Sequence, residues 1–262
     1  MDYTIIKYPR TKHLEGSRLQ PGDEDLNQIP FTEILGKHIV IEEKIDGANT
    51  AISFDADGNL LLQNRGHYLY GGHKERHYNL FKQWANINRD LFYSVLGDRY
   101  IMYGEWMYAK HTIFYDALPD YFMEFDIYDR ERGVFLDTPT RKSFTEQMGI
   151  VSSVYVLGEG IYKSKKQILS YIGNSKFITD KHIDVLRALA ERQGIDVERA
   201  VAETEQSMLM EGLYIKVEED GVVKDRMKFV RAAFLQCVFD SQSHWQSRPI
   251  IPNQLKGNGI IK

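Results

Sequence analysis

A lysine at position 44 opens the tetrapeptide Lys44-Ile45-Asp46-Gly47, and its setting suits a nucleophile. The tetrapeptide follows the apolar run 39–41 and precedes the alternating run 51–54, so the lysine lies between two predicted strands. A nucleophilic lysine must be neutral, and with an ordinary pKa only roughly one in a thousand is neutral near pH 7.4. We expect burial, neighbouring cations or a bound metal to lower its pKa. A surface lysine before a glycine turn would give the same four letters.

Residues further along the chain could supply the rest of a nucleotide-transfer reaction. Such a reaction needs cations on the phosphate oxygens and a carboxylate for a divalent metal. Lys216, Lys228 and Glu211 carry those groups. An aromatic ring can stack on a purine and a carboxylate can accept hydrogen bonds from ribose hydroxyls, which are tasks that suit Phe125 and Glu105.

These residues fall in ordered blocks between Glu42 and Arg231. The blocks are Lys44-Ile45-Asp46-Gly47-Ala48-Asn49, Asn64-Arg65-Gly66, Tyr103-Gly104-Glu105-Trp106, Phe122-Met123-Glu124-Phe125-Asp126-Ile127-Tyr128, and Glu211-Gly212-Leu213-Tyr214-Ile215-Lys216, closed by Arg226-Met227-Lys228-Phe229-Val230-Arg231. In this order and spacing the chain resembles the covalent nucleotidyltransferases, the superfamily of ATP-dependent ligases and RNA capping enzymes.

The resemblance implies a role for each matching residue. Lys44 would form a lysyl-AMP adduct, Arg65 would contact the ribose and the 5′-phosphate of the acceptor end, and Glu105 would hold the ribose of ATP. Phe125 would stack on adenine, and Glu211 would organise Mg²⁺ or Mn²⁺. The remaining residues implied in catalysis or in ATP binding are the phosphate-binding Lys216 and Lys228 and, around the nucleophile and nucleotide, Asp46, Glu43 and Asn49.

Asn49 separates the relatives within this superfamily. DNA ligases and capping enzymes usually carry arginine at that position, whereas asparagine there resembles the RNA ligase 2-like family. The resemblance implies an ATP-dependent RNA ligase that joins 5′-phosphate and 3′-OH RNA ends, with RNA repair as its use and an end-healing enzyme as a possible partner. Two alternatives stay open: a DNA-joining or GTP-using capping-type nucleotidyltransferase, and a non-catalytic nucleotide- or RNA-binding subunit.

The periodicity of the chain predicts an α+β fold. Runs at 39–43, 51–54, 59–62, 100–105, 121–128, 213–217 and 227–230 predict antiparallel strands, with a hairpin at Asp57-Gly58. An apolar stripe predicts a helix or broken pair over 78–96 that ends at Gly97 and keeps Trp84 in the core. Thr138 is expected to cap a helix that Gly149 ends.

The resemblance sharpens this to the ATP-grasp-like nucleotidyltransferase (adenylation) fold of ligases, with antiparallel sheets flanked by helices. We expect an irregular N-terminal segment, 1–37, packed on a main domain, 38–262. A helical insertion is predicted at about 164–210, with Ser164 and Asp196 as caps, and the residues after the last lysine block are too few for a C-terminal OB domain.

Composition restricts the class of protein. The chain has 262 residues, 27% charged and 43% hydrophobic, with a net charge of −4, so a nucleic-acid surface would have to be a local basic patch. Basic clusters at 10–13 and 110–111 suit either a phosphate backbone or a solvated face. Cys237 is the only cysteine, and no segment resembles a signal peptide or membrane span, so we expect a cytoplasmic protein that does not bind membranes; its oligomeric state is open.

Overall fold

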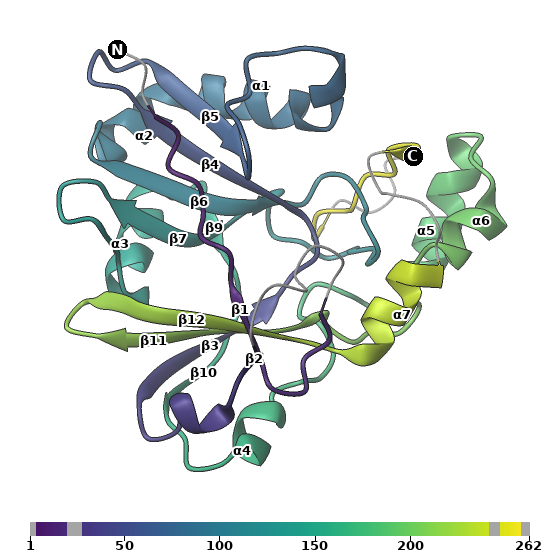
Figure 1. Ribbon diagram of the computed structural model, residues 1–262. Helices are drawn as coiled ribbons and strands as arrows, with labels where there is room; N and C mark the ends of the chain where they lie inside the picture. Colours follow the sequence, from purple (N-terminus) through teal and green to yellow (C-terminus); the bar gives the residue numbers. More distant parts are fainter. Residues whose placement is uncertain (1–3, 20–27, 241–246, 258–262) are drawn as a thin grey trace.

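The computed structural model describes residues 4–19, 28–240 and 247–257, which form two six-stranded sheets flanked by helices (Figure 1). Sheet A has the strand order β10-β3-β11-β12-β1-β2. Its strands are β1 (Lys12–Leu14), β2 (Gln28–Ile29), β3 (His38–Lys44), β10 (Val156–Ile161), β11 (Gly212–Glu219) and β12 (Val222–Val230). The mixed α+β class predicted from the sequence is confirmed.

Sheet B has the order β5-β4-β6-β7-β8, and β9 pairs with β7. Its strands are β4 (Ala48–Phe54), β5 (Leu60–Asn64), β6 (Tyr100–Trp106), β7 (Phe122–Asp129), β8 (Val134–Phe135) and β9 (Ser152–Ser153). The helices are α1 (Asn79–Ile87), α2 (Arg89–Leu96), α3 (Thr138–Met148), α4 (Lys165–Leu169), α5 (His182–Arg192), α6 (Val197–Ala202) and α7 (Ala232–Asp240). Among the helices of the described ranges, none is long and apolar enough to cross a membrane.

Sheet A is apolar on one face and charged on the other. Ile41, Ile215 and Met227 face a core that includes Ile168 of α4. Because side chains alternate along a strand, Lys216, beside Ile215, points to the opposite face. This charged face looks toward sheet B, which lies above it in Figure 1.

The outer face of sheet B is covered by three helices. Phe81 of α1, Phe92 of α2 and Met148 of α3 are buried in one core cluster with residues of β4, β6 and β7. The predicted helix over 78–96 is a broken pair that changes direction at Asn88, and Trp84 packs against this core as expected. One face of sheet B therefore packs against the helices, and the other face borders the space between the two sheets.

Most predicted turns and caps are confirmed. Gly58 (φ 74°) lies in the turn between β4 and β5, and Gly149 (φ 65°) ends α3. Ser164 and Asp196 cap α4 and α6 by accepting hydrogen bonds from backbone N–H groups. The predicted cap at Thr138 is wrong, because the side chain of the preceding Asp137 accepts the bond and Thr138 is already helical.

The N-terminal segment runs along both sheets. It contributes β1, which pairs in parallel with β12 (Lys12 opposite Met227), and β2, which pairs in parallel with β1. Before β1, the carbonyl of Ile6 accepts hydrogen bonds from Gln63 (3.0 Å) and Tyr103 (2.7 Å) of sheet B. The segment therefore links the two sheets, while the division of the chain at residue 37 stays a prediction.

Candidate active site

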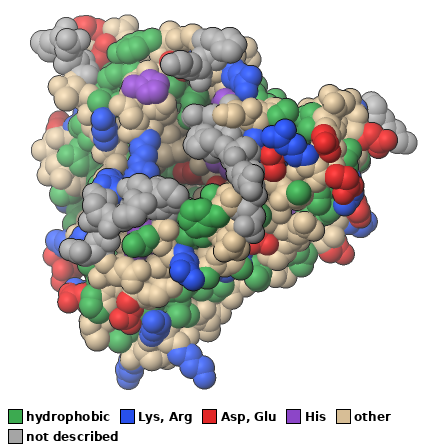
Figure 2. Space-filling model, turned by 45° about the vertical axis from the view of Figure 1, so that its right-hand side comes forward, with side chains coloured by type: hydrophobic (Ala, Val, Ile, Leu, Met, Phe, Trp, Pro, Cys, Tyr) green, Lys and Arg blue, Asp and Glu red, His purple; other side chains and the backbone are tan. Residues whose placement is uncertain are grey.

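A cavity of about 610 Å³ lies between the two sheets. Figure 2 shows a face of the molecule with a hollow that has acidic side chains inside and lysine and arginine side chains near its rim. Its wall includes all but one of the predicted site residues: Glu43, Lys44, Asp46, Asn49, Arg65, Glu105, Phe125, Glu211 and Lys228. Residues from five strands (β3, β4, β6, β7 and β12), from the loops after β3 and β5, and from the position just before β11 therefore meet at one place.

Lys44 is paired with a carboxylate across the strands of sheet A. It ends β3 opposite Gly212, and its Nζ lies 2.7 Å from Oε1 of Glu211. Burial alone would lower the pKa of Lys44, but the negative charges of Glu211 and Glu105 outweigh it and raise the pKa above its ordinary value. The expected lowering of the Lys44 pKa by burial is therefore offset by these carboxylates, and activation by cations or a bound metal stays a prediction.

The carboxylates around Lys44 resist ionisation. Burial raises the pKa of Glu105 to about 8 and that of Glu211 to about 7; Lys44 opposes both shifts, and repulsion from Asp46 adds to them. Carboxyl groups that are held this close and this dry favour a cation beside them. Within the part of the chain that the structure describes, no group of three or more His, Cys, Asp or Glu side chains is arranged to hold a metal ion.

Gly47 is required where it stands. Its N–H donates a 3.2 Å hydrogen bond to Oε1 of Glu105. A Cβ at this position would lie 2.6 Å from Sδ of Met107 and 2.8 Å from Cγ of Glu105, closer than carbon atoms approach. The glycine of the tetrapeptide therefore lets β4 and β6 bring Glu105 beside the lysine.

The Asp46 carboxylate is bound to the backbone. Its Oδ2 accepts hydrogen bonds from the N–H groups of Thr112 (2.7 Å) and Ile113 (3.0 Å), and its own N–H donates to the hydroxyl of Tyr115 (2.8 Å). Asp46 thus fixes the loop after β6 against the end of β3, and its predicted catalytic role stays a prediction.

Glu43 lies in the wall of the cavity and carries a buried acceptor that has no hydrogen-bond partner. The carboxylate is buried, and its Oε2 accepts a 2.9 Å hydrogen bond from the N–H of Lys176, while Oε1 has no hydrogen-bond partner. Burial raises the pKa of Glu43 to about 7, against hydrogen bonds from Ser175 and Lys176. An unpaired buried acceptor favours a ligand that donates a hydrogen bond to it.

Three predicted residues complete the wall. Phe125 of β7 is half-buried, and the ring of Tyr8 meets it edge-on at 5.0 Å. Arg65 is exposed in the turn after β5. In this turn Oδ1 of Asn64 accepts hydrogen bonds from the N–H groups of Gly66 and His67. Lys228 of β12 is buried, and its charge lowers the pKa of Glu211. The three lie on different sides of the same cavity.

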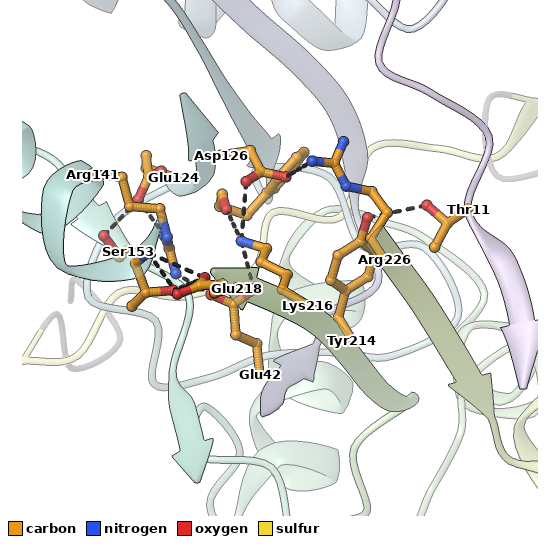
Figure 3. Close-up of polar contacts among 12 residues, drawn as sticks. Thr11, Glu42, Glu124, Asp126, Arg141, Ser153, Tyr214, Lys216, Glu218 and Arg226 are labelled. Carbon is orange, nitrogen blue, oxygen red and sulfur yellow. Dashed lines mark hydrogen bonds and ion pairs between the residues drawn. The ribbon is translucent and has the colours of Figure 1, made fainter. Parts of the chain in front are cut away.

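Lys216 is the predicted site residue that does not line the cavity. Its fully buried Nζ lies 3.0 Å from Oε2 of Glu42 and 3.2 Å from Oδ1 of Asp126, and it donates a hydrogen bond to the carbonyl of Phe125 (Figure 3). A phosphate contact would require the amine to leave these partners. Its predicted phosphate-binding role is untested, and its position is that of a buried support behind the cavity.

Lys216 belongs to a buried cluster of opposite charges, shown in Figure 3. Three carboxylates meet three cations there: Glu42, Glu124 and Asp126 with Arg141, Lys216 and Arg226. Arg141 of α3 pairs with Glu42 of sheet A and, at 2.7 Å, with Glu124 of sheet B. The cluster therefore ties α3 and both sheets together under the cavity.

Sequence reasoning missed most of this cluster. Arg141 is fully buried, although its helix was predicted only from its caps. The alternation of Tyr214, Lys216 and Glu218 with apolar residues was a usable signal, because it places polar side chains on one face of a strand. Tyr8 was also missed; it donates a hydrogen bond to Asp126 and lies 2.7 Å from the hydroxyl of Tyr214.

The predicted basic cluster at 110–111 is not a surface. Lys110 and His111 are both buried, and the Lys110 amine donates hydrogen bonds to the carbonyls of His111 (3.2 Å) and Glu203 (3.1 Å). Neither a phosphate backbone nor bulk water meets these side chains. In the cluster at 10–13, His13 is buried as well, whereas Arg10 and Lys12 are exposed.

Comparison with known proteins decides the family. The model of the family described as RNA ligase matches residues 37–230, which contain strands β3 and β4 on either side of the lysine motif and every residue of the blocks except Arg231. The chain belongs to the RNA ligase family. None of the curated proteins is similar enough to match it.

Solved structures agree with this fold. An RNA ligase from Naegleria gruberi, with ATP and Mn, is 18% identical, with a TM-score of 0.50 over 88% of this chain and 58% of that one. A mutant of the same ligase without ligand gives 18% identity and a TM-score of 0.51 over 90% and 58%. A mutant with AMP and Mn gives 18% and 0.51 over 90% and 59%. This RNA ligase family member therefore spans less than two thirds of the length of those ligases.

Proposed function

We propose that this RNA ligase family member uses ATP to join the 3′-OH and 5′-phosphate ends of RNA, through a lysyl-AMP on Lys44 and an adenylylated RNA end. One observation carries the proposal: the amine of Lys44 lies 2.7 Å from a buried carboxylate at the floor of a cavity large enough for a nucleotide. A surface lysine before a turn would have no such partner. Its place in the cell would be the repair of broken RNA in the cytoplasm, after an end-healing enzyme has prepared the ends.

The chemistry proceeds by three displacements at phosphorus. The neutral Lys44 amine attacks the α-phosphorus of ATP, forming a P–N bond as the bond to the β-phosphate oxygen breaks and pyrophosphate leaves. An oxygen of the RNA 5′-phosphate then attacks the same phosphorus, the P–N bond breaks, and the amine recovers its proton. Finally the RNA 3′-OH attacks the phosphorus of the 5′-phosphate, loses its proton, and AMP leaves.

The residues of the cavity suit these steps. Lys44 must lose its proton before the first step. The pairing with Glu211 keeps the amine protonated until ATP binds. Glu105 lies beside Gly47 where it can accept hydrogen bonds from ribose hydroxyls, and Phe125 offers a ring face to the base. Lys228 places a positive charge near Glu211, where phosphate oxygens would lie.

Glu211 is the residue that would hold a divalent metal ion. Burial raises the pKa of Glu211 and of the neighbouring Glu105, which fits a site completed by a cation, and Mg²⁺ commonly uses one or two carboxylates together with substrate phosphates. When bound, the ion would neutralise the Glu211 carboxylate and stabilise charge on the phosphate oxygens.

The Glu43 carboxylate favours ATP over GTP. Adenine carries an exocyclic amino group at the position where guanine carries a carbonyl oxygen. Glu43 lines the cavity, and its carboxylate, when ionised, can accept a hydrogen bond from that amino group, whereas the guanine carbonyl would meet it with another acceptor. The proposal of an RNA ligase 2-like acceptor preference rests on Asn49, which lines the cavity in β4 opposite Glu105.

A labelled-ATP transfer assay tests the proposal. We expect the wild type to become covalently labelled with α-labelled ATP in Mg²⁺ or Mn²⁺, and Lys44→Ala to remain unlabelled. Lys37→Ala, at an exposed lysine just before β3, is the matched control and should label like the wild type. The central claim fails if the wild type is not labelled or if Lys44→Ala labels equally.

Two further comparisons separate the alternatives. Labelling with GTP instead of ATP would indicate capping-type chemistry, and sealing of nicked DNA in preference to nicked RNA would indicate a DNA-joining enzyme. A non-catalytic binding subunit would bind nucleotide or RNA without either labelling or sealing. The pairing of a half-buried lysine with a buried carboxylate favours catalysis, because nucleotide binding alone requires neither group.

A further inference from the structure

Two segments without acidic residues meet at the rim of the cavity. In a chain of net charge −4, residues 4–13 and 60–74 contain no aspartate or glutamate. They touch each other, because Gln63 of β5 donates a hydrogen bond to the carbonyl of Ile6. The exposed cations of the first segment are Lys7, Arg10 and Lys12, and Lys12 pairs with Asp225 at 3.1 Å.

The second segment is a hairpin whose tip reaches the cavity. The N–H of Asn64 donates to the carbonyl of His67 (3.0 Å), and Gln63 pairs with Tyr68 in an antiparallel bridge. Arg65 and His67, both exposed, lie at the tip and line the cavity. The segment after the tip, residues 67–70, therefore leads away from the proposed site of adenylyl transfer.

The segment 67–70 carries an exposed aromatic side chain. Tyr70 is 85% exposed, although its ring is apolar, and its only ring partner in the described residues is Tyr68, 5.9 Å away at 59°. The contact between the two rings puts Tyr68 and Tyr70 on the same side of this segment. An exposed ring on a segment that carries Arg65 and no acidic residue between positions 60 and 74 matches the way proteins bind single-stranded RNA, by stacking bases on aromatic rings and pairing phosphates with cations.

We propose that Tyr68 and Tyr70, flanked by Lys7, Arg10 and Arg65, form the docking surface for the single-stranded RNA that carries the 5′-phosphate. A base of that strand stacks on Tyr70, and its phosphates pass the cations toward the cavity. This inference rests on the proposed function, since it supplies that reaction with its acceptor.

Binding of a short 5′-phosphorylated, 3′-labelled RNA, measured by fluorescence anisotropy, tests the surface. Tyr70→Ala should weaken binding by roughly 5- to 150-fold, the range for loss of one stacked base, and Tyr70→Phe should restore it. Arg10→Ala should reduce the dependence of log affinity on log salt by about 0.7, the value for one phosphate contact on a single strand. Unfolding temperatures are measured alongside; Tyr70 is exposed, so its replacement should leave them unchanged.

Matched controls remove the same groups elsewhere. Ile87→Ala removes an 83% exposed apolar side chain at the end of α1, and Lys142→Ala removes an exposed charge from α3. Both should bind RNA like the wild type. Equal affinity of Tyr70→Ala and Ile87→Ala would overturn the inference, and so would a wild type that forms lysyl-AMP but does not bind the RNA. A wild type that forms no lysyl-AMP would instead overturn the proposed function.

Discussion

Replacing Lys216 with methionine distinguishes a buried support from a phosphate ligand. The substitution keeps the length of the side chain and removes the charge, so Glu42 and Asp126 lose a partner at 3.0 and 3.2 Å. The cluster changes from three carboxylates facing three cations to three carboxylates facing two cations. Removing one member of a buried ion pair costs about 3–5 kcal/mol.

That loss is large enough to measure by thermal unfolding. For a domain of this size each kcal/mol lowers the midpoint by roughly 2–4 °C, so Lys216→Met should unfold roughly 6–20 °C below the wild type. Lys224→Met is the control on β12, because Lys224 forms an exposed pair with Asp220 at 3.7 Å and should cost at most about 1 kcal/mol.

Lysyl-AMP formation by the same variants completes the test. We expect Lys216→Met to raise the KM for ATP, because the carbonyl of Phe125 loses the amine that fixes it. The reasoning is refuted if Lys216→Met unfolds within about 1 kcal/mol of the wild type and still loses lysyl-AMP formation. That result would make Lys216 a phosphate ligand that leaves its buried partners when ATP binds.

Three other predictions concern the cavity. Glu105→Gln should move the rising limb of the pH dependence of lysyl-AMP formation to lower pH, measured at saturating ATP, because loss of this negative charge lowers the pKa of Lys44; an unmoved limb would contradict it. Glu43→Gln should reduce the preference for ATP over GTP in competitive labelling, because its amide can donate a hydrogen bond to the guanine carbonyl; an unchanged preference would exclude this contact. Gly212→Ala should lower the free energy of unfolding by about 1–3 kcal/mol in denaturant, because its Cβ would lie 1.9 Å from the carbonyl oxygen of Phe229; wild-type stability would show that the strands can separate.

Local patterns in the sequence predicted what local physics determines. The turn at Gly58 and the ends of α3 at Gly149 and of α4 at Ser164 follow from backbone conformation and from caps within three residues. The choice of Thr138 over Asp137 as a cap failed because both residue types are good caps, and only the fold decides which of them has extended backbone. Patterns of this kind predict where helices and strands begin and end, but not how the strands pair with one another.

The charges of the site depended on tertiary structure that local patterns do not contain. The motif residues met at one cavity, yet the pKa of Lys44 is raised, because register places it opposite Gly212 and so beside Glu211. Lys216 belongs to the same block as Glu211 but is buried, because its pairing partners come from β3 and β7. Whether a cation faces the ligand or supports the wall depends on neighbours far away in the sequence.

The balanced cluster under the cavity has a consequence for how this chain can evolve. Any single change among Glu42, Arg141 and Lys216 leaves a buried charge without its counterpart, so intermediates along a path of one-residue steps would be poorly folded. Related sequences should therefore either retain all three residues or replace them jointly. The exposed hairpin at Tyr70 has no such buried partners, so its sequence can change together with the RNA that it binds. If the buried cluster is kept as a unit while residues at the rim of the cavity change, one adenylyl-transfer chemistry could act on new RNA acceptors.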